Sequence, residues 1–379
     1  MRDLNEVRRD ITEIDRQIVD LFLKRMSCSE EVSDYKMATG GAVYVPSRET
    51  ELLSTLLAKV PEEYRLEYTA LLKTTMRISR KHQYERMLAN EPERLQLPIK
   101  ERIQAPSTVC YQGLPGSYQH YVSSKLFPNA AQSYLPTWED VFQSVSEGRT
   151  DIGVVPVENS TAGTVNEVYD LLEKYGLSIS HSYIAKIRHC LCACPGATLD
   201  TVRDVHSHPQ ALRQCHNYIK SHGFRDHNES NTAVAAELVQ QANDPTKAAI
   251  CSEAAAELYG LTILERGVND GTFNQTRFIA VTRELSAKPE DTRVSLILTL
   301  PHICGSLSSA LAVFGDYGVN MTEIHSRPLP DMPWNYCFYV DFDGNLLHQD
   351  TRALVYQMIQ ELPAVRVLGS FPVISEEDT

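Results

Sequence analysis

The sequence from Leu4 to Thr39 reads LNEVRRDITEIDRQIVDLFLKRMSCSEEVSDYKMAT and contains neither proline nor glycine. Its apolar residues recur at alternating steps of three and four, at Leu4, Val7, Ile11, Ile14, Ile18 and Leu21. This spacing places them on one face of an α-helix. Gly40 and Gly41 follow, and glycine is favoured at helix C-termini because it readily adopts a positive φ. The stretch therefore predicts one long amphipathic helix.

Helical patterns continue after this first helix. Pro46-Ser47 predict the start of a second helix that runs to about Lys59, and a third amphipathic stretch extends from about Tyr64 to Met87. Residues 1–90 are therefore predicted to form an all-helical domain. The following segment, 91–106, is polar and contains prolines, which is typical of a linker.

The pattern changes after residue 106. Short apolar runs at 108–111, 152–155 and 248–251 alternate with helical stretches at 138–147 and 233–241, which predicts an α/β domain over 107–283. Residues 292–374 then follow the order strand, helix, strand, strand, helix, strand, which fits a ferredoxin-like βαββαβ sandwich. The fold class is therefore a multidomain combination of α and α/β domains.

The composition restricts the kind of protein. Hydrophobic residues make up 42% and charged residues 22%, a balance typical of globular proteins, and the net charge of -13 disfavours a nucleic-acid partner. No run approaches the roughly 20 apolar residues of a membrane span, and the N-terminus is charged where a signal peptide is apolar. We therefore expect a cytoplasmic protein without a membrane partner. Its nine cysteines are expected to be reduced.

Two local motifs invite a ligand but do not fit one. His189, Cys190, Cys192 and Cys194 have metal-ligating side chains. Alternate residues of a strand share one face, so their thiolates would diverge along it rather than form a tetrahedral site. We expect buried structural cysteines and no metal. The glycine-containing turn at 113–118 matches neither common nucleotide-binding pattern.

Seven polar residues are distributed over the three predicted helices: Arg8, Arg25, Lys36, Arg48, Glu49, Ser79 and Gln83. Each alone would be expected on a solvated surface. Together with Ile14-Asp15 and Val43-Tyr44, the set resembles the all-helical chorismate mutases. The resemblance implies that the three arginines hold the substrate carboxylates and that Lys36 and Gln83 are catalytic, reaching the ether oxygen. It also implies that Glu49 takes the substrate hydroxyl while Ser79 assists.

The rearrangement that such enzymes perform needs no nucleophile and no metal, so we expect no cofactor. Catalysis must come from holding a dianion in its reactive shape and stabilising charge at the breaking bond, for which the planar arginine fork is suited. On one helix Arg25 and Lys36 lie about 16 Å apart on nearly the same face and can converge, whereas Arg8 lies roughly 25 Å beyond Arg25. We therefore expect a dimer in which Arg8 serves the partner's site. Val45 stands where the family often has an acidic residue.

Four motifs mark the α/β segment: Gly113-Leu-Pro-Gly-Ser-Tyr118, Pro156 to Gly163, Ser207-His-Pro-Gln210 with Gln214, and Asn274-Gln-Thr-Arg-Phe278. In this order they resemble prephenate dehydratase. The resemblance implies two lobes like those of type 2 periplasmic binding proteins, with the site between them. The implied prephenate-binding residues are Glu158, Asn159, Ser160, Thr161, Gly163, Ser207, His208, Gln214, Arg277 and Phe278.

The dehydratase reaction expels a hydroxyl and a carboxylate, so a proton must reach the leaving hydroxyl. The resemblance implies that Thr276 is the catalytic donor. Threonine is a weak acid, and the alternative is that Thr276 only orients the substrate while Glu158 or a bound water supplies the proton. For His208 we prefer an orienting role, because it precedes a proline turn.

The C-terminal segment resembles the ACT domains of phenylalanine-inhibited dehydratases. The resemblance rests on Gly305-Ser-Leu-Ser308, Asn320 and Ser326-Arg-Pro328, although the family often has Gly-Ala-Leu-Val in the first loop and Glu where this chain has His325. The implied phenylalanine-binding residues are Gly305, Ser306, Leu307, Ser308, Asn320, His325, Ser326, Arg327 and Pro328. A purely structural role in dimerisation is the alternative.

Together the resemblances imply a bifunctional enzyme that converts chorismate to prephenate and prephenate to phenylpyruvate, with phenylalanine as its inhibitor. We expect a homodimer or a larger even homo-oligomer. Two alternatives stay open. The chain could be an amino-acid-sensing binding protein with a mutase domain, or its dehydratase could act on arogenate rather than prephenate.

Overall fold

The computed structural model describes residues 2–271, 273–329 and 335–376. Within this part of the chain there are two compact units. One runs through Leu97 and includes Leu296–Arg366, and the other comprises Pro98–Ser295 and continues from Val367. The first unit contains both the helical region and most of the C-terminal sandwich. The division into two units therefore does not test the predicted boundaries of three domains, which stay a prediction.

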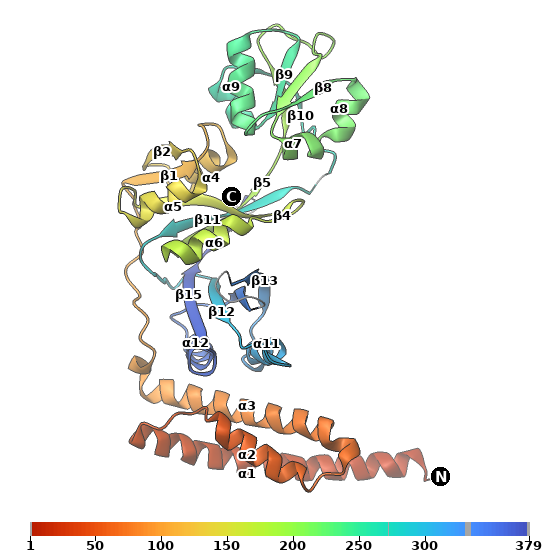
Figure 1. The fold of residues 1–379 in the computed structure, drawn as a ribbon, viewed down its shortest axis with the longest axis vertical. Helices are drawn as coiled ribbons and strands as arrows, with labels where there is room; N and C mark the ends of the chain where they lie inside the picture. Colours follow the sequence, from red (N-terminus) through yellow and green to blue (C-terminus); the bar gives the residue numbers. More distant parts are fainter. Residues whose placement is uncertain (1, 272, 330–334, 377–379) are drawn as a thin grey trace. The chain divides into compact units, whose positions relative to one another are not determined.

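Three long helices form the helical region, as predicted (Figure 1). They are α1 (Leu4–Thr39), α2 (Pro46–Leu57) and α3 (Arg65–Asn90), with short 3-10 turns at η1 (Glu62–Tyr64) and η2 (Pro92–Arg94). The Asp3 carboxylate accepts a hydrogen bond from the amide of Asn5 and caps the start of α1. Gly40 ends the helix with a φ of 74°, the left-handed conformation that glycine adopts most easily.

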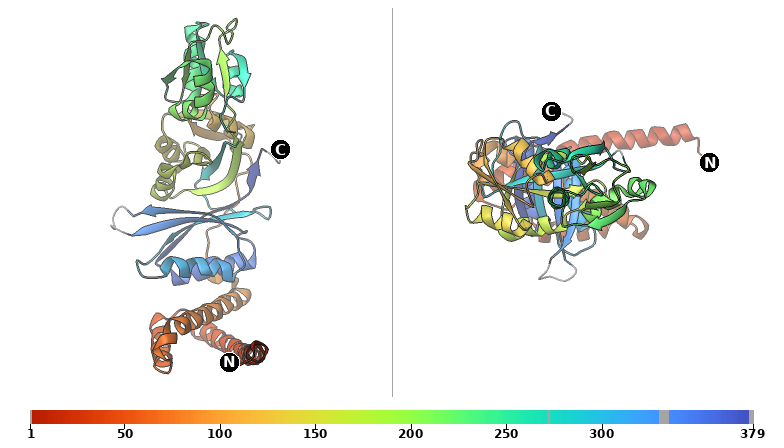
Figure 2. Two further views of the ribbon diagram at one scale, coloured as in Figure 1. Left: turned by 90° about the vertical axis from the view of Figure 1, so that its right-hand side faces the viewer. Right: turned by 90° about the horizontal axis from the view of Figure 1, so that it is seen from above.

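The C-terminal sandwich has the predicted βαββαβ order. Its elements are β12 (Arg293–Thr299), α11 (Ser306–Asp316), β13 (Met321–Pro328), β14 (Tyr336–Asp343), α12 (Gln349–Glu361) and β15 (Ala364–Phe371). The strands form one sheet in the order β13-β14-β12-β15, and both helices cover the same face of it (Figure 2). Strands β12 and β15 each begin in one compact unit and end in the other.

The second unit contains two sheets, which confirms the two-lobed α/β prediction (Figure 1). The first sheet has the order β16-β5-β11-β3-β1-β2, with β4 beside β3, and comprises β1 (Thr108–Gln112), β2 (Ala131–Leu135), β3 (Ile152–Asn159), β4 (Gly163–Thr164), β5 (Ser178–Lys186), β11 (Gln275–Thr282) and β16 (Val373–Ser375). Its helices are α4 (Tyr118–Leu126), α5 (Trp138–Ser146) and α6 (Asn166–Tyr175).

The second sheet has the order β10-β6-β9-β7-β8. Its strands are β6 (Cys190–Ala193), β7 (Asp204–Ser207), β8 (Arg225–Asn228), β9 (Lys247–Cys251) and β10 (Thr262–Arg266), and its helices are α7 (Pro209–Gln214), α8 (His216–His222), α9 (Thr232–Ala242) and α10 (Glu253–Leu258). The chain enters this lobe between β5 and β6 and returns between β10 and β11. Two short crossings therefore lie where the lobes meet.

The glycine-containing turn at 113–118 serves the packing of the two lobes. Gly116 has a φ of 89°, and a Cβ built there would lie 3.0 Å from the Cα of Ala255 in α10. Ser252, which caps α10, donates a hydrogen bond of 3.0 Å to the carbonyl oxygen of Gly116. Glycine is required at this position because the backbone of the other lobe approaches it closely.

The segment predicted to be a linker is partly built into the second unit. Arg102 is buried and donates two hydrogen bonds, of 2.8 and 2.6 Å, to the Asp291 carboxylate. It also donates to the carbonyl oxygen of Ser370 at 2.7 Å. The guanidinium of Arg102 thus joins three distant segments of the chain.

The cysteines of β6 are buried, as expected. Cys190 and Cys192 pack with apolar residues of α9 and α10, whereas Cys194 belongs to the core on the other side of the sheet. Burial raises the pKa of the Cys190 thiol to about 11, which keeps it protonated. Among the described residues, no helix is long and apolar enough to span a membrane.

Candidate active sites

The first candidate site lies between α1 and α3. Arg25 of α1 donates hydrogen bonds to the Ser79 hydroxyl and, at 3.1 Å, to the carbonyl oxygen of Thr75. Ser79 is buried. Partial burial lowers the pKa of Arg25, and the Glu49 carboxylate opposes this effect. The site therefore contains a guanidinium held by neutral groups, whose charge remains available to an anion.

The second cation of this site is Lys36, which lies further along α1 than Arg25. The Lys36 ammonium donates to Gln83 Oε1 at 3.2 Å and to the carbonyl oxygen of Val43 at 3.0 Å. Burial lowers the pKa of Lys36, while Glu49 raises it and Arg80 lowers it further. The structure thus brings together Arg25, Lys36, Ser79 and Gln83 within one chain.

Glu49 is positioned by Arg80, a residue that belongs to none of the sequence motifs. Glu49 lies in the first turn of α2, and its carboxylate accepts a hydrogen bond from Arg80 of α3. Arg80 directly follows Ser79, and it resembles the many solvated arginines of helices when only the sequence is read. Its role is visible only through its tertiary contacts.

Two predicted residues lie apart from this cluster. Arg8 is exposed on α1, and Arg48 is exposed and pairs with Glu51 at 3.1 Å. The first half of α1 also exposes a row of apolar side chains: Ile11, Ile14, Ile18, Leu21 and Leu23, each more than half exposed. A large exposed apolar stripe of this kind typically marks an interaction surface.

The second candidate site is a cavity of about 210 Å³ where the two lobes of the α/β unit meet. Its polar lining side chains are Ser117, Gln119, Asn159, His189, His208, Gln210, Gln214, Asn231, Thr232 and Thr276. Among the described residues that line it there is no arginine, lysine, aspartate or glutamate. Hydroxyl, amide and imidazole groups therefore provide its polar surface.

Asn159 and Thr276 face each other on the adjacent strands β3 and β11. The backbone amides of Thr161 and Ala162 donate to Asn159 Oδ1 at 3.1 and 2.9 Å, which identifies this atom as the acceptor oxygen. The Asn159 amide nitrogen must then donate to Thr276 Oγ1, at 2.9 Å. Because the hydroxyl oxygen accepts this bond, its own proton can be donated elsewhere.

A chain of side chains extends from this pair across the cavity. Thr161 donates to Asn159 Oδ1 at 2.7 Å, and Gln214 Nε2 donates to the Thr161 hydroxyl at 2.7 Å. Gln214 Oε1 in turn lies 3.1 Å from His189 Nε2. Burial lowers the pKa of His189 to about 4, so the imidazole is neutral near pH 7. In the sequence His189 stands out only through its neighbouring cysteines, and its place in this cavity depends on tertiary contacts with Gln214.

The other residues predicted to bind prephenate occupy several environments. His208 caps α7 by accepting from the Gln210 amide at 3.2 Å and lines the cavity with Phe278. Ser160 accepts from the Gln275 amide at 3.0 Å, and Gly163 pairs with Asn159 in the short strand β4.

Six of the residues predicted to bind prephenate are not among those that line the cavity: Glu158, Ser160, Thr161, Gly163, Ser207 and Arg277. Ser207 is buried and donates to the carbonyl oxygen of Ile250 at 2.6 Å. Arg277 alternates with Thr276 and Phe278 along β11, and its guanidinium donates to the Tyr169 hydroxyl at 3.3 Å. Successive residues of a strand face opposite sides, which explains why Arg277 points away from the cavity.

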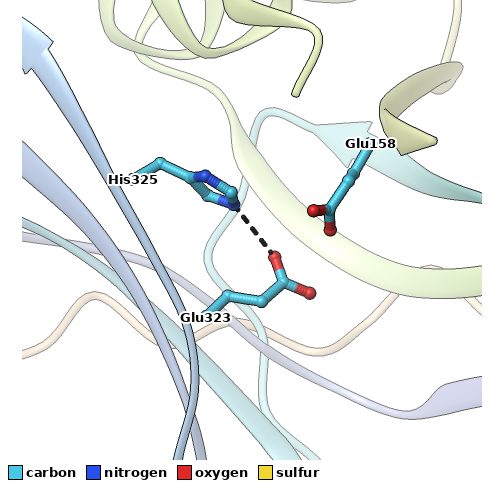
Figure 3. Close-up of side chains that lie close together, drawn as sticks. All are labelled: Glu158, Glu323 and His325. Carbon is cyan, nitrogen blue, oxygen red and sulfur yellow. Dashed lines mark ion pairs between the residues drawn. The ribbon is translucent and has the colours of Figure 1, made fainter. Parts of the chain in front are cut away.

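The residues predicted to bind phenylalanine lie in two segments, one at the start of α11 and one from Asn320 to the end of β13. Gly305 and Ser306 line a cavity of about 240 Å³ at the start of α11, where Gly305 has a φ of 79°. Asn320 donates to Asp343 at 2.9 Å, and His325 lies 3.5 Å from the Glu323 carboxylate on β13 (Figure 3). Leu307 and Ser308 follow Gly305 on α11, while Ser326, Arg327 and Pro328 end β13.

Comparisons with known proteins match both parts of the chain. Residues 7–84 match the chorismate mutase type II family, and residues 109–286 match the prephenate dehydratase family. A bifunctional chorismate mutase/prephenate dehydratase of Enterobacter agglomerans is 29% identical over 374 residues, covering 97% of this chain and 95% of that protein. The arogenate dehydratase/prephenate dehydratase 2 of Arabidopsis thaliana is 34% identical over 276 residues, covering 70% of this chain and 72% of that protein.

A solved structure is similar as well. The prephenate dehydratase of Arthrobacter aurescens in complex with L-Phe superposes with a TM-score of 0.64 at 27% identity, covering 70% of this chain and 90% of that chain.

Proposed function

The chain belongs to the family of bifunctional chorismate mutase/prephenate dehydratases, and we propose that its two candidate sites perform these two reactions. The helical region rearranges chorismate to prephenate, and the α/β unit converts prephenate to phenylpyruvate in the biosynthesis of phenylalanine. The observation that carries the proposal is the presence of a gathered polar site in each of the two matched segments of one chain.

In the mutase site, Arg25 and Lys36 present two cations beside the neutral groups of Ser79 and Gln83. A dianionic substrate satisfies these charges in a partly buried setting, where electrostatic interactions are stronger than in water. We assign Arg25 to a carboxylate and Lys36 with Gln83 to the ether oxygen. Because the donors are held by their own hydrogen bonds, they stabilise the developing charge without a large reorganisation.

In the dehydratase site, Thr276 is assigned as the donor of a proton to the leaving hydroxyl. Its oxygen accepts from Asn159, which directs the hydroxyl proton away from Asn159 and stabilises the oxygen once the proton has left. The alternative donor Glu158 is not among the residues that line the cavity. The neutral His189 is better suited to holding Gln214 than to acid catalysis.

The mutase site requires a further residue from a second chain. We assign this role to Arg8, which is exposed on the same half of α1 as the apolar stripe. Pairing of two chains through this stripe would cover the apolar side chains and bring Arg8 to the partner's site. The proposed assembly is therefore a dimer, or a larger even oligomer built from such dimers.

Phenylalanine is proposed as the effector of the C-terminal sandwich. The Arthrobacter aurescens relative was solved with L-Phe, and here the start of α11 offers a left-handed glycine and backbone donors beside a cavity. A zwitterionic amino acid can use such donors for its carboxylate. For the dehydratase substrate we propose prephenate, as in the bifunctional relative, while the Arabidopsis thaliana relative is named for arogenate as well.

The test uses the purified full-length chain with chorismate, following prephenate and phenylpyruvate with and without phenylalanine. Arg25→Ala should lower mutase turnover by about 10²- to 10³-fold, because a positioned donor is lost. The same variant should convert added prephenate at the normal rate. If a folded Arg25→Ala protein lost both activities, the assignment of two separate sites would be wrong.

A further inference from the structure

Arg80 connects the mutase site to the C-terminal sandwich within the first compact unit. Its Nη1 atom donates to Glu49 of α2, while Nε and Nη2 donate to the two oxygens of Glu361 of α12 at 2.8 and 3.0 Å. The guanidinium also lies 4.7 Å from the centre of the Tyr44 ring. The side chains of Arg80 and Glu361 are only 12% and 10% exposed. Three anchors thus fix the guanidinium in one orientation.

The geometry determines what each carboxylate does. A guanidinium presents its donors in a rigid plane, and Glu361 occupies one edge of that plane with two parallel hydrogen bonds. Glu361 is itself held by Gln357, whose amide donates to it at 3.0 Å. The remaining Nη1 donor therefore points at Glu49 because Glu361 has set the plane. Loss of the Glu361 charge would free the guanidinium, and the Glu49 carboxylate would lose its fixed partner.

We infer that Arg80 is a positioning residue for the mutase reaction, and that Glu361 of the C-terminal sandwich holds it in place. The inference rests on the proposed mutase function and on the role that the family resemblance implies for Glu49, namely contact with the substrate hydroxyl. Turnover of chorismate then depends on the ion pair between Arg80 and Glu361, two residues that lie about 280 positions apart in the sequence. A cavity of about 240 Å³ is lined by Glu49, Arg80 and Glu361 together with Gly305 and Ser306, so the start of α11 borders this relay.

A neighbouring ion pair provides a matched control. Arg77, one turn earlier on α3, donates to Asp316 of α11 at 2.5 and 3.2 Å, and both side chains are about as buried as those of the first pair. This pair also joins α3 to the sandwich, but Asp316 does not share its arginine with Glu49. An effect that comes only from loosening the contact between α3 and the sandwich should appear in variants of either pair.

The experiment compares Glu361→Gln with Asp316→Asn in the full-length protein. For Glu361→Gln we expect kcat/KM for chorismate to fall about 10- to 100-fold, mainly through a higher KM, since misplacement of a binding group has effects of this size. Conversion of added prephenate should stay unchanged. Asp316→Asn should retain wild-type kcat/KM for chorismate. Equal losses in both variants, or no loss in Glu361→Gln, would overturn the inference.

A double mutant tests whether Glu361 acts through Arg80. Arg80→Met should lower kcat/KM for chorismate to the same extent as Glu361→Gln or more, and adding Glu361→Gln to it should cause no further loss. A further loss in the double mutant would show that Glu361 acts by another route and would overturn the inference. Glu49→Gln separates the proposals: if it turned over chorismate like the wild type, the role of Glu49 would fail while the two assigned activities would stand.

Discussion

The hydroxyl of Thr276 accepts a hydrogen bond whose direction is fixed by two backbone amides on the far side of Asn159. The hydroxyl proton is therefore available to a ligand in the cavity. Removal of the hydroxyl group should slow the dehydratase reaction. We expect Thr276→Val, nearly isosteric but without a hydroxyl, to lower dehydratase turnover by about 10²- to 10⁴-fold. Thr276→Ser should retain substantial activity. Near-normal turnover of the valine variant on prephenate would move the proton donation to a bound water or to Glu158.

His189 gives the stability of the protein a predictable dependence on pH. Burial lowers its pKa to about 4, from an ordinary value of 6.5. Between these two pKa values His189 binds a proton in the unfolded chain but not in the folded chain. The contribution of His189 to the unfolding free energy is therefore complete above pH 6.5 and is lost as the pH falls toward 4. Between pH 7 and pH 5 the loss amounts to about 2 kcal/mol of unfolding free energy.

Urea unfolding of His189→Gln at pH 7 and pH 5 tests this expectation. The variant should lose about 2 kcal/mol less than the wild type over this interval, because the titrating group is gone. His216→Gln, at an exposed position of α8, is the control and should behave like the wild type. If the two variants lost the same free energy on acidification, the burial of His189 would not be the cause.

Single residues also show which parts of the two sites could be predicted from the sequence. The polar residues of the mutase site were identified through a resemblance. Arg25 and Lys36 both lie on α1, and helix geometry explains why their side chains can reach one ligand. Arg80 could not be identified in this way, because an exposed helical arginine and a structural one have the same local pattern. Arg277 was predicted with Thr276 from one motif, although strand alternation places neighbouring residues on opposite faces.

At the scale of elements, periodicity was sufficient where an element is amphipathic and ends at a glycine or proline. Helix α1 agrees with the prediction for this reason, since it ends at Gly40. It was insufficient at 91–106, where polar residues and prolines indicate a linker. Arg102 is buried there because two other segments supply its partners, and this information is not local.

The Arg102–Asp291 pair should therefore be a major tie in the second unit. Its side chains are 3% and 0% exposed, so removing one partner leaves a buried charge uncompensated. We expect Asp291→Ala to lower the unfolding free energy by about 3 to 5 kcal/mol. Glu147→Ala breaks the exposed pair with Arg149 and should leave the unfolding free energy almost unchanged, because an exposed ion pair contributes little. If Asp291→Ala changed the unfolding free energy only slightly in urea unfolding, residues 91–106 would act as a linker, as the sequence predicts.

For the whole molecule, the C-terminus limits which experiments are informative. Strand β16 pairs with β5, and Glu376 accepts a hydrogen bond from Tyr121 at 2.6 Å, so the last part of the chain completes the sheet of the dehydratase. Truncation after Thr282 would remove both contacts together with Asp291. Regulation by phenylalanine is therefore better tested by point variants in the full-length chain.

The proposed sharing of the mutase site between two chains predicts complementation. A row of apolar side chains on the first half of α1 is exposed, and Arg8 on the same half lies too far along a straight helix from Arg25 to reach the same small ligand. Arg8→Ala and Lys36→Ala should each abolish most mutase turnover, since each removes a cation from every site of a homodimer.

After the two variants are mixed and exchange subunits, each heterodimer should contain one site in which Lys36 from one chain meets Arg8 from the other. Equal mixing places half of the dimers in this class, so mutase activity should recover to about a quarter of the wild-type value. Dehydratase activity on added prephenate serves as the control and should be constant throughout. Subunit exchange is followed by native mass spectrometry with a tagged chain. If exchange were complete and no activity returned, Arg8 would act in its own chain or not at all.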